Sequence, residues 1–205
     1  MFTEITPKMK ERMLFLESID AEDRCNGTDR MKRLRQIPPK TGKFISILAA
    51  STPQGEMLEI GTSAGYSTMW LSLAAQLKNQ KINTFELLPE KIQLAKETFR
   101  MVGITDLIEL NEGDALTQLD RFQDISFCFI DCEKTMYMDC WNILCDKIVP
   151  GGMIIADNAI NHIETLRPMI DKALSDDRFD SLVVPIGKGE LVCRRKTVEI
   201  VDNGG

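Results

Sequence analysis

The sequence predicts one α/β domain built on a mostly parallel sheet, and three observations support this. From Glu56 onward, short apolar runs alternate with helix-like segments, which is the order of a parallel sheet covered by helices on both faces. Residues 127–130 and 153–156 are continuously apolar, as central strands buried on both faces are. Only residues 187–189 join the last two predicted strands, so that pair has to be antiparallel.

The composition describes a single soluble domain. The chain has 205 residues, of which 43% are hydrophobic and 27% charged, enough for one large core and short for two. We expect residues 1–205 to form one domain, with an N-terminal helical segment at 1–51, a core at 52–196 and a tail at 197–205. A net charge of −6 argues against nucleic-acid or membrane partners. No signal-peptide core or membrane-length apolar run is present, so a cytoplasmic protein is expected.

The six cysteines contain no C-x-x-C pair, and His162 is the one histidine of the sequence. A structural zinc site is therefore not expected. We expect the thiols to pack as small hydrophobic groups.

The first 51 residues are expected to be helical. Pro7 suits the first turn of a helix, and Thr6 suits its cap. A short basic helix is predicted at 30–35, ended by the two prolines at 38 and 39. An apolar helix is predicted at 42–50.

The core is expected to alternate strands and helices. Strands are predicted at 56–60, 81–86, 107–111, 125–130, 152–156, 181–186 and 190–195, and helices at 65–78, 89–102, 135–148 and 164–175. Pro168 is expected in the first turn of the last helix, because inside a helix it removes a hydrogen bond.

A glycine turn follows the first predicted strand. The strand stops at Gly61, a small-residue turn runs to Gly65, and a helix then begins. Glycines let the backbone approach a ligand, and free N–H groups at a helix start attract polar groups. The spacing is G-x-x-x-G rather than the dinucleotide pattern G-x-G-x-x-G, so a plain tight turn is the alternative interpretation.

Acidic residues stand where predicted strands end, at the sheet edge where α/β proteins bind ligands. Glu86 can accept both hydroxyls of a ribose, which serves NAD and S-adenosylmethionine alike, or it can cap the helix after it. Asp114, after the third strand, can face an adenine edge or cap the turn that follows.

Asp131, Asp157 and Asn158 form a second group at this edge. Two carboxylates and an amide offer oxygen ligands, which suit a hard cation such as Mg²⁺. Lys134 is expected above the same site, where it can take a proton from a cation-bound hydroxyl. The alternative for Lys134 is a surface ion pair with Glu133 or Asp139.

These motifs resemble those of the cation-dependent O-methyltransferases of the catechol and caffeoyl-CoA type. The residues that carry the resemblance are Glu86 and the segments 37–42, 59–67, 113–115, 129–134, 150–158 and 185–191. The resemblance covers about residues 30–196. It implies the Rossmann-like class I methyltransferase fold, with seven strands and an antiparallel last hairpin.

The resemblance also implies S-adenosylmethionine as methyl donor, a divalent cation and a homodimer. The donor would contact Ile37, Gly61, Thr62, Ser63, Tyr66, Ser67, Glu86, Leu87, Asp114, Ala115 and Asp131. The cation would be bound by Asp131, Asp157 and Asn158. Lys134 would be the general base, with Asp131 beside it in the catalytic group.

The chain departs from this pattern after Asn158. The catechol type has a longer insertion and an aromatic residue there, whereas this chain continues with Ala159, Ile160, Asn161 and His162. A more open acceptor site is therefore expected. His162 is either a second base, an acceptor contact or an ordinary polar residue.

We therefore predict a methyltransferase acting on a hydroxyl of a small acceptor with vicinal hydroxyls. One alternative is an NAD-linked oxidoreductase, which would use Gly61 and Glu86 but not the group around Asp131. A second is a non-catalytic donor-binding protein. A third is a methyltransferase acting on a modified nucleoside, suggested by the basic residues at 30–35.

Overall fold

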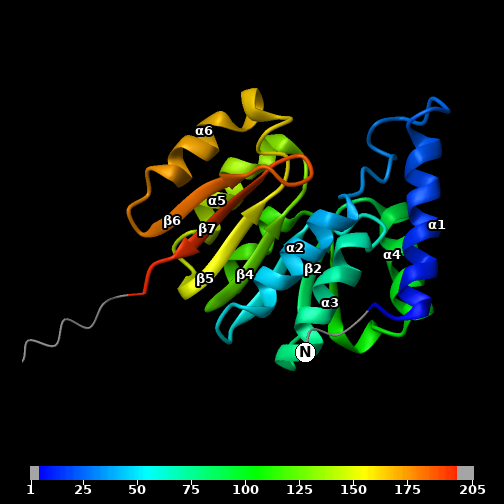
Figure 1. Cartoon of the computed structure of the whole chain (residues 1–205), viewed down its shortest axis with the longest axis horizontal. Coiled ribbons are helices and arrows are strands. Elements are labelled where there is room, and N and C mark those ends of the chain that lie inside the picture. The colour runs from blue at the N-terminus through cyan, green and yellow to red at the C-terminus, as the bar shows by residue number, and fades with distance from the viewer. Residues whose placement is uncertain (1–4, 198–205) are drawn as a thin grey trace, which may run out of the picture.

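The computed structural model describes residues 5–197, and within them a seven-stranded sheet lies between helices on both faces (Figure 1). The strands are β1 (Glu56–Ile60), β2 (Ile82–Glu86), β3 (Ile108–Glu112), β4 (Ile125–Ile130), β5 (Ile148–Ala156), β6 (Phe179–Val184) and β7 (Glu190–Arg195). The helices are α1 (Pro7–Asp23), α2 (Pro39–Ala50), α3 (Tyr66–Lys78), α4 (Pro89–Val102), α5 (Tyr137–Leu144) and α6 (Ile163–Leu174).

The strand order is β3-β2-β1-β4-β5-β7-β6. The first five strands pair in parallel, and β7 runs antiparallel to both β5 and β6. The predicted fold class, including the antiparallel last hairpin, is confirmed. The continuous apolar run of β4 is buried along its whole length, as a central strand should be.

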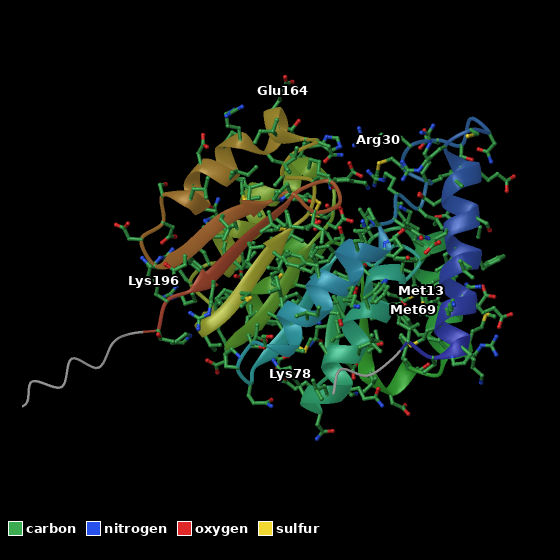
Figure 2. The ribbon with its side chains drawn as sticks, in the orientation of Figure 1. Met13, Arg30, Met69, Lys78, Glu164 and Lys196 are labelled. Carbon is green, nitrogen blue, oxygen red and sulfur yellow. The ribbon has the colours of Figure 1, made fainter. Side chains whose placement is uncertain are left out.

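Two apolar layers hold the helices to the sheet. Phe127 and Phe129 of β4 belong to the layer that α1, α2, α3 and α4 share, while Cys128 and Ile130 belong to the layer with α5 and α6. This alternation follows from the period of two along a strand. Met13 of α1 and Met69 of α3, labelled in Figure 2, are both buried in the first layer.

The predicted basic helix at 30–35 is wrong. Residues 28–38 form one turn followed by extended chain, and Arg35 has a φ of 53°. Acidic side chains at the end of α1 accept backbone N–H groups of this segment, Asp23 from Leu34 and Asp20 from Gln36. Because these contacts replace helical hydrogen bonds, the segment stays extended.

The prolines at 38 and 39 begin a helix instead of ending one. Pro38 is the extended N-cap and Pro39 the first residue of α2, a position where a missing N–H costs nothing. The predicted cap of α1 is confirmed, since the Thr6 hydroxyl accepts a hydrogen bond from Met9 N–H.

Pro168 lies inside α6, not in its first turn as predicted. The apolar face of α6 is buried at Leu166, Met169 and Ile170, and this packing outweighs the hydrogen bond that proline cannot make. The helix predicted at 135–148 is shorter, because α5 ends at Leu144 and β5 starts at Ile148. Of the predicted tail, all but Thr197 lies outside the described residues.

The backbone ladder continues past the strands and positions the candidate site. Gly61 N–H donates to Phe85 O, Asp131 N–H to Ile60 O, and Asp157 N–H to Ile130 O, all within 3.1 Å. The ends of β2, β1, β4 and β5 are therefore held side by side. In Figure 1 the arrows of β4 and β5 point to the upper edge of the molecule, where the connection between α1 and α2 also lies.

Candidate active site

A cavity of about 370 Å³ opens at the carboxyl ends of β1, β2 and β4. Every site residue predicted from the sequence lines it except Asp157: Lys134, Asp131, Ile37, Gly61, Thr62, Ser63, Tyr66, Ser67, Glu86, Leu87, Asp114, Ala115 and Asn158. Leu34, Arg35 and Ile37 reach it from the connection between α1 and α2, which therefore forms one wall.

The glycines of the turn after β1 are required by packing within the chain. Gly61 has a φ of 106°, and a Cβ there would stand 2.2 Å from the carbonyl oxygen of Asp131. Gly65 has a φ of 83°, and its Cβ would meet the ring of Phe99 at 2.6 Å. Both positions need glycine even without a ligand, so the turn alone indicates no cofactor.

Glu59 lies fully buried beneath this turn and accepts hydrogen bonds from the hydroxyls of Ser67, Thr68 and Thr84 at 2.5–2.6 Å. Burial raises the pKa of Glu59 to about 7, against the three hydroxyl bonds that lower it. The Ser67 hydroxyl therefore donates to Glu59 and not into the cavity.

Glu86 is satisfied by backbone groups. Its carboxylate accepts from Ser63 N–H at 2.7 Å and from Leu87 and Leu88 N–H at 3.0 and 2.9 Å. These bonds hold the backbone that leads into α4, but Leu88 is the N-cap of α4 and no side chain caps the helix, so Glu86 is not the predicted helix cap. The ribose role stays a prediction for a side chain that also lines the cavity. Nearby Lys91 is only 7% exposed, and burial lowers the pKa of its ammonium.

Two other predicted donor residues use their polar atoms within the chain. The Tyr66 hydroxyl donates to Glu17 Oε1 at 2.5 Å, which ties α3 to α1. Asp114 Oδ1 accepts from Leu116 N–H at 2.9 Å, so it caps the turn after β3, while its contact with an adenine stays a prediction.

Lys134 is held at the end of β4 by several oxygen atoms. Its ammonium donates to Asp131 Oδ1 and Cys132 O, both at 3.0 Å, and to the Tyr137 hydroxyl at 2.8 Å. The side chain is only 10% exposed. Its acidic partner is Asp131, not Glu133 or Asp139, so the alternative of a surface pair with either of those residues is wrong.

Asp157 is fully buried under the cavity floor. Its Oδ1 accepts from Asn158 N–H at 2.7 Å, while its Oδ2 and both carboxyl oxygens of Glu190 receive no hydrogen bond from residues 5–197. Burial and the charge of Asp131 raise the pKa of Asp157, and burial and the charge of Asp157 raise the pKa of Glu190. The two carboxyl groups therefore need a proton or a cation between them or beside them.

This donor set fits a hard cation. The part of the chain described has no group of three His, Cys, Asp or Glu side chains arranged around one metal position. The predicted set, however, contains two carboxylates and the amide of Asn158, which is 4% exposed and lines the cavity. This set includes a buried carboxylate oxygen of Asp157 without a hydrogen bond, and Mg²⁺ prefers oxygen ligands of this kind.

A second cavity of about 250 Å³ adjoins the first and is lined mostly by cations. We call it the basic cavity; its residues are Asp20, Arg24, Arg30, Arg33, Arg35, Lys134 and His162. Burial lowers the pKa of His162, and the neighbouring cations, first Lys134 and then Arg30, lower it further. His162 lines both cavities, and its role as a second base, an acceptor contact or an ordinary polar residue stays a prediction.

Sequence reasoning missed two residues of this region. Glu190 is an acid beside the apolar run 191–193, a signal of a buried charge. Lys91 carried no such signal, because a lysine on a helix is ordinarily exposed. Arg30 and Arg35 belong to the basic residues at 30–35, which suggested the modified-nucleoside acceptor, although the helix predicted for them does not form.

The comparisons with known proteins agree with this geometry. The model of the O-methyltransferase family matches residues 17–196. The chain belongs to the O-methyltransferase family. This membership confirms the predicted resemblance and enzyme class, and it decides against the NAD-linked oxidoreductase.

Named relatives in this family match at moderate identity. A catechol O-methyltransferase of Niastella koreensis is 31% identical over 129 residues, which cover 60% of this chain and 58% of that protein. A caffeoyl-CoA O-methyltransferase of Medicago sativa is 26% identical over 203 residues, which cover 82% of each chain.

Solved structures share the fold. An SAH-bound methyltransferase of Podospora anserina superimposes with a TM-score of 0.74 at 22% identity, covering 94% of this chain and 89% of that one. An O-methyltransferase of Bacillus cereus in complex with SAH gives a TM-score of 0.73 at 20% identity, covering 93% and 91%. Within residues 5–197, none of the helices is long and apolar enough to span a membrane.

Proposed function

We propose that the protein transfers the methyl group of S-adenosylmethionine to a hydroxyl of a small acceptor with vicinal hydroxyls, with a divalent cation at the site. The observation that carries the proposal is the pairing of Lys134 with Asp131 at 3.0 Å, on the wall of the cavity and beside the buried carboxylate of Asp157. Relatives named catechol and caffeoyl-CoA O-methyltransferase support the acceptor class.

The donor would occupy the larger cavity. Its ribose hydroxyls would bond to Glu86, and its other polar groups would meet the backbone of the turn from Gly61 to Ser63. Methyl transfer to oxygen is an in-line displacement, so the main task of these walls is to hold donor and acceptor in line. Leu34 and Ile37, on the connection between α1 and α2, would give the donor an apolar wall.

Asp131, Asp157 and Asn158 would hold the cation, which when bound supplies positive charge that lowers the pKa of an acceptor hydroxyl. Lys134 would take the hydroxyl proton on its Nζ atom. A phenol and a lysine both titrate near ~10 in isolation, so a modest push suffices for the transfer. The positive charge of the bound cation would provide that push, because it lowers the pKa of the hydroxyl.

The test is methyl transfer to a dihydroxyphenyl acceptor with labelled S-adenosylmethionine. We expect EDTA to abolish transfer and Mg²⁺ to restore it, because the proposed ligands are all oxygen donors. Calorimetric binding of S-adenosylhomocysteine provides a second readout that needs no acceptor. Full activity in metal-free buffer would remove the cation from the mechanism, and absence of S-adenosylhomocysteine binding would remove the donor.

A further inference from the structure

The basic cavity lies next to the proposed reaction centre. Arg24, Arg35, Lys134 and His162 line both cavities, so a molecule that reaches Lys134 can extend directly into the basic cavity. Figure 2 labels Arg30 at the upper edge of the molecule, on the connection between α1 and α2 and on the side where α6 begins near Glu164.

The cations of this cavity exceed the acids that face them. Arg24 is paired with Asp20, and Arg30 and Arg35 share the single carboxylate of Glu133. No acidic side chain of the described chain forms an ion pair with Arg33, whose guanidinium donates only to Thr28 O at 2.7 Å. The local excess of positive charge stands out in a protein whose net charge is −6.

Lys188 adds to this excess from the other side of the larger cavity. It lies on the loop between β6 and β7, where its ammonium donates a long hydrogen bond to Gln36 O at 3.5 Å. Its charge is close enough to His162 to lower the pKa of that imidazole. Positive charge therefore converges on the acceptor side from two separate segments.

Arg35 has a strained backbone and an unsatisfied side-chain donor. Its φ of 53° is a left-handed conformation that side chains other than glycine, asparagine and aspartate seldom adopt. The Nε atom of Arg35 is buried and has no hydrogen-bond partner within residues 5–197. Strained backbone and an unsatisfied donor are features that functional sites retain when a ligand makes use of them.

We propose that the acceptor carries an oxyanion, either a carboxylate or a phosphate, and that Arg33, Arg30 and Arg35 of the basic cavity bind it. Guanidinium groups bind both oxyanions with paired, charge-assisted hydrogen bonds. This inference rests on the proposed function, because it places the other end of the same acceptor above Lys134. Because these arginines lie on the connection between α1 and α2, this segment would determine which acceptor binds.

A small molecule explains the arrangement better than a nucleic acid does. Nucleic-acid sites spread cations over an extended face of a basic protein. Here the arginines line one cavity of about 250 Å³ on a protein of net charge −6. The volume suits a single anionic group and the short linker that joins it to a dihydroxyphenyl ring.

The experiment compares four acceptors that share the dihydroxyphenyl ring: dihydroxyphenylethanol, dopamine, dihydroxyphenylpropionate and dihydroxyphenylethyl phosphate. At low, constant ionic strength we expect kcat/KM to be about tenfold higher for an anionic acceptor than for the neutral alcohol, the effect of one charge-assisted hydrogen bond. Dopamine should be the poorest acceptor. Whichever anion is preferred identifies the source of the oxyanion.

Arg33→Gln tests the site directly. It should remove the preference through KM, lowering kcat/KM for the anionic acceptor about tenfold while the value for the alcohol stays unchanged. The unchanged alcohol rate also shows that the variant is folded. Arg33→Lys keeps the charge and should retain most of the preference. Lys32→Gln is the matched control, because Lys32 is exposed on the same segment and lines neither cavity.

The outcomes separate this inference from the proposed function. Equal kcat/KM for all four acceptors, or an Arg33→Gln variant with the wild-type preference, overturns the oxyanion subsite and leaves methyl transfer standing. Preferential methylation of RNA, with no preference among the small acceptors, also overturns the subsite. Absence of transfer to every acceptor overturns the proposed function and the subsite together.

Discussion

The two halves of the candidate site differ in how their charges are satisfied. In the donor half, under β1 and β2, Glu59 accepts three hydroxyl hydrogen bonds and Glu86 accepts three from backbone N–H groups. In the acceptor half, Asp157 and Glu190 have carboxyl oxygens without donors, and Arg33 has no acidic partner among the described residues. The two carboxylates of the donor half are satisfied within the chain, whereas the buried carboxyls of the acceptor half need a proton or a cation.

The physical reason lies in what each half binds. A buried polar group without a partner costs about 1–3 kcal/mol, so a ligand that supplies the partner gains binding energy there. The ribose and the adenine of the proposed donor present neutral hydroxyls and ring nitrogens, which a pocket whose carboxylates are already satisfied can accept by exchanging hydrogen bonds. The proposed cation and oxyanion would instead require fixed opposite charges, which Asp157 and Arg33 can supply.

The largest expected effect comes from Lys134. Lys134→Ala should lower kcat by roughly 10²–10⁴-fold, the usual contribution of a positioned base, and leave S-adenosylhomocysteine affinity near wild type. Raising the pH should recover part of the rate, because the bound hydroxyl then ionises without the lysine. The measurement is a pH–rate profile with a dihydroxyphenyl acceptor.

Two variants serve as controls for Lys134. Lys134→Arg keeps the charge but cannot accept a proton, so it should be as slow as the alanine variant. Asp157→Ala should respond to excess Mg²⁺ and not to pH alone. If Lys134→Ala keeps the wild-type rate and profile, the base lies elsewhere and His162 is the next candidate.

Glu86→Ala should show whether Glu86 binds the donor or only accepts hydrogen bonds from backbone N–H groups. Each charged hydrogen bond to the ribose is worth on the order of 1.5–3 kcal/mol, so S-adenosylhomocysteine should bind at least about tenfold more weakly in calorimetry. A loss of thermal stability is expected as well, since Leu87 and Leu88 lose their acceptor. A lower thermal stability with unchanged affinity for S-adenosylhomocysteine would show that Glu86 only holds the backbone before α4.

Glu59→Gln should show how the buried carboxyl of Glu59, under the turn after β1, makes the stability of the protein depend on pH. The folded pKa of about 7 lies above the ordinary 4.5, so the folded protein binds this proton more tightly than the unfolded chain. Its stabilising contribution is complete below pH 4.5 and is lost as the pH rises to about 7. The free energy of unfolding of the wild type, relative to the glutamine variant, should fall by on the order of 2–3 kcal/mol over that range.

Denaturant unfolding at several pH values gives this difference directly. Taking the difference between the two proteins cancels the titration of Asp157 and Glu190, which both share. A difference that does not change with pH would show that folding leaves the pKa of Glu59 unshifted.

The smallest effect is expected for Tyr66→Phe. The Tyr66 hydroxyl donates to Glu17 and not into the cavity, so its loss should cost about 1 kcal/mol of stability. Donor affinity should stay within about twofold, because the ring that lines the cavity is retained. A tenfold loss of S-adenosylhomocysteine affinity would instead place the hydroxyl among the donor contacts.

Much of the fold could be predicted from the sequence because its signals are local. Hydrophobic periodicity sets the strands and helices, and the three-residue link at 187–189 requires an antiparallel hairpin. Residues at the carboxyl ends of parallel strands meet at one edge of the sheet, so the sequence alone predicts that Gly61, Glu86, Asp131 and Asn158 lie together. All four line the same cavity.

The tertiary structure alone decided what depends on contacts between distant segments. The chain after the turn at 30–33 is extended because Asp23 and Asp20 accept the N–H groups of Leu34 and Gln36, which a helix would use. Asp157 meets Glu190 through the pairing of β5 with β7, and Arg35 meets Glu133 across 98 positions. Such contacts carry no periodic signal, because burial and charge balance depend on which segments the completed sheet brings together.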